Sequence, residues 1–162
     1  MVDVANVMGA RADGWWRDRA GAALRLCREV MALAQREDSP AGAWVLVLEG
    51  AARDAAPLLA DSARPDATAR PGADWVPPTR DEEPGEVMPV RVVSAPGSGD
   101  DAIVGAVAEA VAREEDSCLV VTADRELRRR CEELNASVVG PGWLLQLLPA
   151  GKTALPPVVS AA

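Results

Sequence analysis

Acidic side chains lie at the ends of the segments that read as β-strands, and these residues have the clearest potential for chemistry. Asp3 lies inside the apolar stretch "VDVANVMG" (2–9), with Asn6 three residues further on. A buried carboxylate is costly unless a partner compensates it. Acidic residues occupy the same place in or after three later strand segments: Glu49, Asp100, Asp101 and Asp124.

These acids are expected to share one edge of a sheet. Ligands of open α/β sheets bind beyond the carboxyl ends of the strands, where parallel strands bring their last residues together. Several carboxylates within a few ångströms repel one another unless a cation neutralises them or some become protonated. Oxygen ligands without imidazole or paired thiolates favour hard ions such as Mg²⁺ or Mn²⁺. The pattern therefore predicts a divalent-metal site.

Each acid also has a purely structural interpretation. Asp100, Asp101 and Asp124 all stand where a helix is expected to begin, and aspartate there caps the helix and complements its dipole. Glu49 would be a solvent-exposed residue after its strand. Asp3 is harder to explain in this way, because it lies within an apolar strand pattern. The metal site is preferred because four strand ends agree.

The composition narrows the chemistry further. The chain has 162 residues and contains no His, Tyr or Phe, which excludes Ser-His-Asp and Cys-His catalysis and the common zinc sites that need imidazole. Cys27, Cys118 and Cys131 form no CxxC pair and are expected to be buried thiols in a reducing cytoplasm. The formal charge of −8 argues against nonspecific nucleic-acid binding, so a polyanion partner requires a local basic patch.

Apolar runs that alternate with amphipathic segments predict the elements that position these acids. Strands are expected at residues 2–7, 43–50, 89–95, 117–123 and 136–140, and helices at 16–36, after 97–101, at 124–134 and at 141–148. Strands that alternate with helices predict a three-layer α/β/α sandwich with a mainly parallel central sheet of about five strands.

Apolar residues at helical spacing predict which helix faces point inward. The expected inward residues are Ala20, Leu24, Cys27, Met31 and Ala34 in the first helix, and Ile103, Val104, Val107 and Val111 in the helix that follows residue 101. Trp44 and Trp143 are expected in the core.

A single domain is expected over residues 1–148. A Pro-rich insertion at 57–89 interrupts it, with a short helix over 51–59, and a flexible tail follows at 149–162. No apolar run approaches the ~20 residues of a membrane span, and the first residues lack the composition of a signal peptide. We therefore expect a cytoplasmic protein without a membrane partner, and a homodimer stays open.

Four stretches of the chain carry a family resemblance when they are taken in order. They are "VDVANVMG", "VLVLEG", "GSGDDAIVGAVAEA" and "VVTADRELRRR". Together they resemble the PIN-like nucleases, specifically the NYN branch that includes the YacP-like proteins. In that branch the first strand ends in Asp-Gly-x-Asn, and the fourth reads Thr-x-Asp-Arg. Here Val4 and Ala5 replace the usual Gly and aromatic residue, and Glu49 stands where Asp is usual.

The resemblance implies a PIN-like, Rossmann-like domain that acts as a metal-dependent ribonuclease. It implies that Asp3, Asp101 and Asp124 hold Mg²⁺ or Mn²⁺ and act in catalysis. Asp100 and Glu49 would be further ligands, directly or through water. Two uncharged residues complete the implied site: Asn6 would act with the catalytic acids, by orienting one or contacting a phosphate, and Thr122 would hydrogen-bond within the site, beside the substrate.

Contacts to RNA are expected from "RADGWWRDR" (11–19), which follows the first strand on the acidic edge. Arginines there could hold backbone phosphates, and Trp15 or Trp16 could stack on an unpaired base. The alternative for Trp16 is packing against the first helix. The basic candidates for substrate binding are Arg11, Arg17 and Arg19 in this segment, and Arg125 next to Asp124.

Two other functions stay open. One is a non-catalytic RNA- or protein-binding module that keeps the acidic pocket as a vestige, in line with the low net basicity. The other is a nucleotide phosphohydrolase that uses the same acids on a small substrate, although the chain has no Gly-rich phosphate-binding signature.

Overall fold

The computed structural model describes residues 1–62, 90–113 and 117–149. Most of the Pro-rich insertion expected at 57–89, and nearly all of the tail expected at 149–162, lie outside the described residues. Up to residue 62 the start of the insertion is helical, in line with the short helix expected over 51–59.

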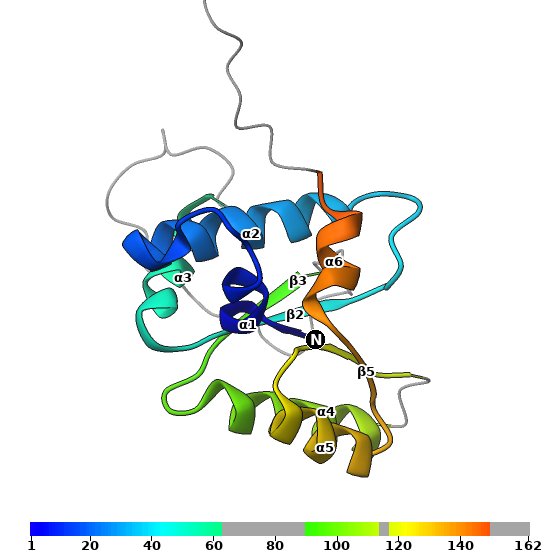
Figure 1. The fold of residues 1–162 in the computed structure, drawn as a ribbon. Helices are drawn as coiled ribbons and strands as arrows, with labels where there is room; N and C mark the ends of the chain where they lie inside the picture. The colour runs from blue at the N-terminus through cyan, green and yellow to red at the C-terminus, as the bar shows by residue number, and fades with distance from the viewer. Residues whose placement is uncertain (63–89, 114–116, 150–162) are drawn as a thin grey trace, which may run out of the picture.

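Five parallel strands form one sheet at the centre of the molecule (Figure 1). They are β1 (Val2–Asp3), β2 (Trp44–Leu48), β3 (Val90–Ser94), β4 (Leu119–Val121) and β5 (Ser137–Val139). Their order is β3-β2-β1-β4-β5, and each neighbouring pair is parallel. The predicted three-layer α/β/α sandwich with a parallel central sheet is confirmed.

The sequence of β2 explains why the sheet is covered on both faces. Leu46 and Leu48 are fully buried on one side of this strand, and Val47 is buried on the other. Successive side chains of a strand point to opposite faces, so an unbroken apolar run requires a helical layer on each side. Burying each leucine stabilises the fold by about 1.5–3 kcal/mol relative to leaving it exposed.

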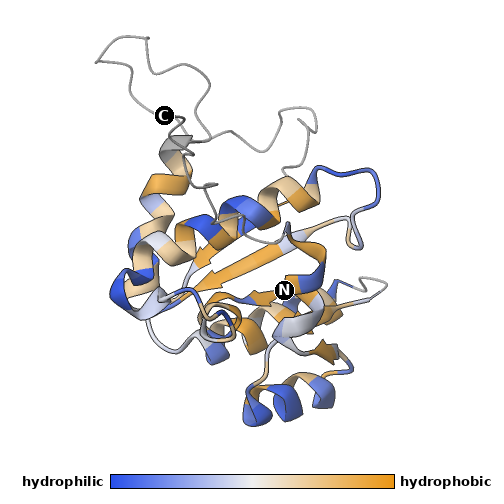
Figure 2. Ribbon diagram, turned by 45° about the horizontal axis from the view of Figure 1, so that its top comes forward, coloured by the Kyte–Doolittle hydropathy of each residue, from blue (hydrophilic) through white to orange (hydrophobic). Residues whose placement is uncertain are grey.

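Helices form a layer on each face of the sheet (Figure 1). One layer contains α1 (Val4–Gly9), α2 (Arg19–Ala34), α3 (Ala55–Ser62) and α6 (Pro141–Leu147), and the other contains α4 (Gly99–Ala112) and α5 (Arg125–Glu133). Two short 3-10 helices, η1 (Trp15–Arg17) and η2 (Gly50–Asp54), precede α2 and α3. Figure 2 shows the central strands as a strongly apolar part of the molecule.

The first strand is shorter than the sequence pattern predicts. The expected strand covers residues 2–7, but β1 ends at Asp3 and the following residues form α1. The carboxylate of Asp3 accepts a hydrogen bond from the backbone N–H of Asn6 and so caps this helix. Val2 and Val4 are two residues apart, as on one face of a strand, whereas Val4 and Val7 are three apart, as on one face of a helix. The apolar spacing therefore could not separate the two.

The buried face of α2 is rotated from the expected one. Of the residues expected to point inward, Cys27 is fully buried, whereas Ala20, Leu24, Met31 and Ala34 are half-buried. The buried residues of the helix are Ala22, Ala23, Leu26, Cys27, Val30 and Leu33. Apolar residues occupy more than one face of this helix, so packing against the sheet selects the face that periodicity leaves ambiguous.

Other core predictions hold in part. In α4, Ile103 and Val107 are buried as expected, but Val111 is 45% exposed. Trp44 is buried, whereas Trp143 is half-buried. The three cysteines are free thiols: Cys27 and Cys131 are buried, and Cys118 is half-buried. Among the described residues, none of the helices has both the length and the apolar character that crossing a membrane requires.

Candidate functional site

The strand order places a switch point beside β1. From β1 the chain moves outward through β2 to β3, and then returns to the other side of β1 to form β4 and β5. In open parallel sheets this point leaves a crevice beyond the carboxyl ends of the two central strands. Asp3 is the last residue of β1, and Thr122 directly follows β4, so both lie at this crevice.

Asp3 is held by hydrogen bonds to both of its carboxylate oxygens. The residue is only 8% exposed. Its Oδ1 accepts from the backbone N–H of Asn6 at 3.0 Å, and its Oδ2 accepts from the Thr122 hydroxyl at 2.9 Å. The same Thr122 oxygen accepts from the backbone N–H of Asp124 at 3.1 Å. This chain of contacts fixes Asp3 and the start of α5 relative to each other.

Asn6 also connects the segments that follow the two central strands. Its side-chain oxygen, Oδ1, accepts a hydrogen bond from the backbone N–H of Ala123 at 2.9 Å. Residue 123 lies in the turn between β4 and α5, so Asn6 ties α1 to that turn. The contact gives Asn6 a positioning role at the edge of the crevice.

Glu49 and Asp124 each accept a hydrogen bond from the first turn of a helix. Asp124 is the N-cap of α5 and accepts from the backbone N–H of Leu127 at 2.8 Å. Glu49, which follows β2, accepts from the backbone N–H of Gly99 at 2.8 Å. A Cβ atom at residue 99 would lie 2.7 Å from Oε2 of Glu49, so a larger residue there would displace the Glu49 carboxylate from this position.

Four carboxylates line one open pocket at this edge of the sheet, with a volume of about 660 Å³. We call it the acidic pocket, and its acids are Asp3, Glu49, Asp100 and Asp124. They come from β1, the residue after β2, the first turn of α4 and the N-cap of α5. The convergence expected from the four strand ends is therefore present in the structure.

The charges of these acids disfavour one another. Burial raises the pKa of Asp3, and the nearby Asp100 and Glu49 carboxylates raise it further, against the opposing effect of its hydrogen bonds with Asn6 and Thr122. Burial also raises the pKa of Asp100, and the charges of Asp124 and Glu49 add to the increase. A cation in the pocket would relieve both effects.

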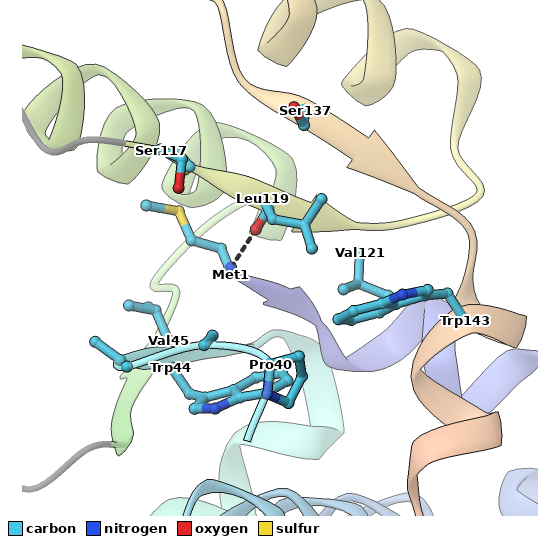
Figure 3. Close-up of a pocket in the computed structure, with 13 residues that line it drawn as sticks. Met1, Pro40, Trp44, Val45, Ser117, Leu119, Val121, Ser137 and Trp143 are labelled. Atoms are coloured by element: carbon cyan, nitrogen blue, oxygen red, sulfur yellow. Dashed lines mark hydrogen bonds between the residues drawn. The ribbon is translucent and has the colours of Figure 1, made fainter. Parts of the chain in front are cut away.

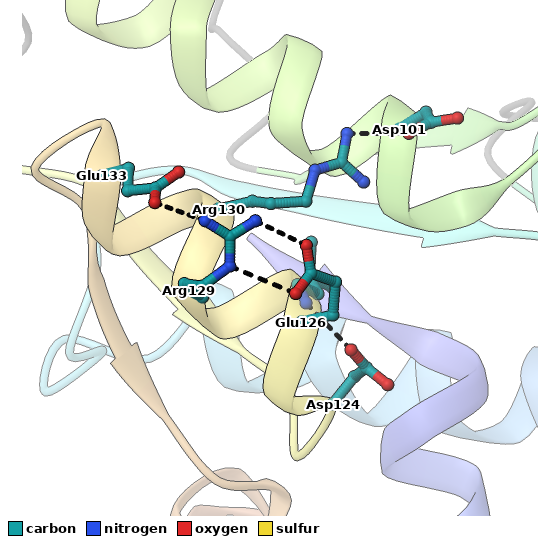
Figure 4. A network of polar contacts seen from close by, with 7 residues as sticks. Asp101, Asp124, Glu126, Arg129, Arg130 and Glu133 are labelled. Atoms are coloured by element: carbon teal, nitrogen blue, oxygen red, sulfur yellow. Dashed lines mark hydrogen bonds and ion pairs between the residues drawn. The ribbon is translucent and has the colours of Figure 1, made fainter.

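Asp101 does not line the acidic pocket, although the resemblance implied that it is a metal ligand. Its carboxylate is 71% exposed and pairs with the guanidinium of Arg130 on α5 at 2.8 Å (Figure 4). Ser98 is the N-cap of α4, which directs Asp100 rather than Asp101 into the pocket. The sequence interpretation gave the capping role to Asp100 or Asp101, and it gave no signal for the partner Arg130, which is 29 residues away along the chain.

The donors of the acidic pocket suit a hard divalent ion, but they do not form a closed ligand set. Among the residues that the structure describes, no group of three or more His, Cys, Asp or Glu side chains is arranged to hold a metal ion. Mg²⁺ commonly keeps several waters and binds through one or two carboxylates. An open pocket of oxygen ligands fits that mode, with Asp100 and its neighbours Asp3, Glu49 and Asp124 as the available donors.

The expected RNA-contacting residues differ in their surroundings. Arg11 forms an ion pair with Glu29 of α2, and Thr122 is fully buried, so its contact is with Asp3 rather than with solvent. Arg125 is exposed at the start of α5. The other arginines of α5 pair mainly with acids of their own helix: Arg128 with Glu132, and Arg129 with Glu126 and Glu133 (Figure 4).

The two adjacent tryptophans differ in their exposure to solvent. Trp15 is half-buried and packs against the core. Trp16 is 58% exposed, so the alternative that it packs against the first helix is wrong. Their rings meet edge to face, with centroids 6.3 Å apart.

A different pocket lies at the opposite, amino-terminal edge of the sheet (Figure 3). It has a volume of about 510 Å³, and Trp44 and Trp143 are among its lining residues. The amino group of Met1 donates a hydrogen bond to the carbonyl of Leu119 beside it. No carboxylate side chain of the described residues lines this pocket, so it lacks the chemistry of the acidic pocket.

Comparison of the chain with protein-family models, with curated proteins and with solved structures yields no significant match.

Proposed function

We propose that the chain is a metal-dependent ribonuclease that hydrolyses RNA phosphodiester bonds with Mg²⁺ or Mn²⁺. The observation that carries the proposal is the meeting of four carboxylates, from four separate strand ends, in the acidic pocket at the switch point of the sheet. The resemblance to the NYN branch of the PIN-like nucleases supports RNA as the substrate, and the three free cysteines support a cytoplasmic location.

Asp100, with Asp3, Glu49 and Asp124 around it, would hold the ion. A bound divalent ion would lower the pKa of water, orient it for in-line attack and stabilise the leaving oxygen, without any histidine. Asn6 and Thr122 would keep the surrounding backbone and Asp3 in place, because their hydrogen bonds join β1, α1 and the start of α5. Preorganised ligands reduce the cost of assembling the site at the moment of reaction.

One observation favours a second candidate, a non-catalytic RNA- or protein-binding module. Among the described residues, the acids do not form a closed ligand set. The same would be true of an acidic pocket that no longer binds a metal. The two candidates differ in whether Mn²⁺ and RNA together give cleavage products.

The test is cleavage of a panel of single-stranded and structured RNAs by the purified full chain with Mg²⁺ or Mn²⁺. Asp3→Asn and Asp100→Asn should each lower the rate by more than about 100-fold, because changes to the outer-shell partners of metal ligands alone cost 10–100-fold. Glu126→Gln is the matched control, since it also removes one negative charge but its side chain pairs with Arg129 outside the pocket.

Asp101→Asn is a further variant, which tests the role that the resemblance gave this residue. Because its carboxylate pairs with Arg130, we expect a rate close to that of Glu126→Gln. If no RNA is cut by the wild type and Asp3→Asn behaves identically, the ribonuclease proposal fails. Turnover of nucleoside triphosphates without RNA cleavage would instead indicate the nucleotide phosphohydrolase.

A further inference from the structure

A second pocket adjoins the acidic pocket on the side of η1. It has a volume of about 490 Å³, and it shares Ala5 and Glu49 with the acidic pocket. Trp15 and Arg19 line its far side, together with small residues of η2. We call it the tryptophan pocket. Because the two pockets have lining residues in common, they lie next to each other.

The rim of the tryptophan pocket combines aromatic rings with positive charge. The guanidinium of Arg19 lies over the ring of Trp15 at 5.4 Å from its centroid, and that of Arg17 lies over Trp16 at 6.0 Å. Both distances are within the range of cation–π attraction. The two indoles meet edge to face, so Trp15, Trp16, Arg17 and Arg19 form one unit that reaches from the pocket to the surface.

Trp16 is the most exposed large apolar side chain in the described part of the chain, at 58%. A ligand that covers this exposed indole would remove apolar surface from water. The backbone of Trp16 lies in η1, and its ring meets that of Trp15 edge to face. An exposed aromatic ring is suited to stacking on a planar group.

The arginines of this unit are available to an anion. In the described residues neither Arg17 nor Arg19 forms an ion pair. The nearby acids are engaged with the backbone instead: Asp13 accepts from the N–H of Trp15, and Asp18 accepts from the N–H of Gly21. The segment therefore presents positive charge beside a pocket that is otherwise acidic.

We propose that the tryptophan pocket and its rim form a subsite for one unpaired nucleotide that flanks the phosphate in the acidic pocket. The base stacks on Trp16, and Arg19 and Arg17 contact the adjoining phosphates. The subsite selects single-stranded over duplex RNA, because a base that remains paired cannot lie on the indole. This inference rests on the proposed function for the identity of the ligand, but it concerns binding and not cleavage.

The test separates binding from cleavage. A fluorescein-labelled, 2′-O-methyl single strand is titrated with the full chain in Ca²⁺, so that affinity is measured without turnover. Trp16→Ala should raise Kd about tenfold, the order of magnitude of one stacked base. Trp16→Phe should restore most of the affinity, because a phenyl ring can also stack. Val111→Ala is the matched control, since it truncates another exposed apolar side chain, on α4.

Other outcomes decide between the alternatives. Equal affinity of wild type and Trp16→Ala for the single strand would overturn the subsite, as would equal affinity of the wild type for the single strand and for its duplex. If Trp16→Ala instead abolishes self-association measured by light scattering and leaves RNA affinity unchanged, the ring is a contact between copies of the chain and the subsite is refuted. RNA binding that depends on Trp16 in a protein that cuts no RNA would support the subsite and refute the ribonuclease.

Discussion

A single hydroxyl group, that of Thr122, joins two acids of the acidic pocket. It donates to Asp3 and accepts from the backbone N–H of Asp124, and the residue is completely buried. Because the side chain is fully buried, it acts through the acids that it positions and not by touching a substrate. The resemblance placed Thr122 in the site, and the structure specifies the contact that it makes.

Replacing this hydroxyl provides a prediction at the scale of one residue. Thr122→Val keeps the shape but leaves the Oδ2 atom of Asp3 and the N–H of Asp124 without their partner, so unfolding free energy should fall by about 1–3 kcal/mol. Thr122→Ser keeps the hydroxyl and should lose about 1 kcal/mol or less, for one methyl group. Urea denaturation in EDTA measures both, and equal stability of the valine variant and the wild type would contradict the prediction.

The identities of the pocket acids could be predicted from the sequence only in part. Asp3, Glu49 and Asp124 follow directly from their places at strand ends, because parallel strands must bring these ends together. The choice between Asp100 and Asp101 could not be made in this way. Neighbouring residues of a helix point about 100° apart, so the cap at Ser98 and the distant Arg130 decide which carboxylate enters the pocket.

At the scale of elements, two acids of the pocket also cap the helices that follow them. Asp124 caps α5, and Asp3 caps α1. The structural interpretation of aspartate at a helix start and the metal interpretation are therefore not exclusive. Each capping carboxylate has a second oxygen and further lone pairs, so it can satisfy a backbone N–H and still face the pocket.

Two substitutions of Asp124 separate these roles. Asp124→Asn should keep the cap and change the unfolding free energy by only a few tenths of a kcal/mol, because Asn is as good an N-cap as Asp. Asp124→Ala should lose about 1 kcal/mol. Both should lose the proposed ribonuclease activity, since neither has a carboxylate. Guanidinium denaturation and the RNA cleavage assay together check this, and equal stability losses for the two variants would contradict the capping role.

The strands and helices themselves are largely predictable, since alternation of buried runs with amphipathic segments leaves few arrangements. The strand prediction over residues 4–7 is wrong because Val2 and Val4 have strand spacing, whereas the helical spacing of Val4 and Val7 is too short a signal to outweigh it. The face of α2 was misassigned because small and apolar residues nearly surround that helix. In both cases a tertiary contact decides: the cap at the Asn6 N–H in the first, and packing against the sheet in the second.

At the scale of the whole molecule, the acidic pocket makes stability depend on pH. The raised pKa of Asp3 means that folding favours its protonated form. This contribution is fully present below the ordinary Asp pKa of about 4 and is lost as pH rises through the higher folded-state value. In the absence of metal, the wild type therefore folds at neutral pH against the charge of its own pocket.

The comparison with Asp3→Asn isolates this contribution. Asn resembles the protonated acid, so in EDTA the variant should gain stability relative to the wild type as pH rises from about 4 to neutrality. A gain of 1 kcal/mol corresponds to about 2–4 °C in Tm for a domain of this size. Thermal melts at both pH values measure it, and a difference that shrinks with rising pH would contradict the sign.

Divalent ions should reverse the order at neutral pH. An ion that binds only the folded state at 100 times its Kd adds about 2.7 kcal/mol of stability. We expect Mn²⁺ to raise the Tm of the wild type and of Glu126→Gln, but to have little effect on Asp3→Asn. A wild type that shows no change in Tm with either ion would favour the non-catalytic module.

The contact between Asp3 and Thr122 joins positions that are 119 residues apart in the chain, and the contact between Asn6 and Ala123 spans 117. Closing a loop of this length is entropically costly and slow in comparison with forming a helix. No fragment that ends before residue 122 contains both partners of the first contact. A chain whose synthesis stalls between residues 49 and 122 therefore carries Asp3 and Glu49 without an assembled pocket.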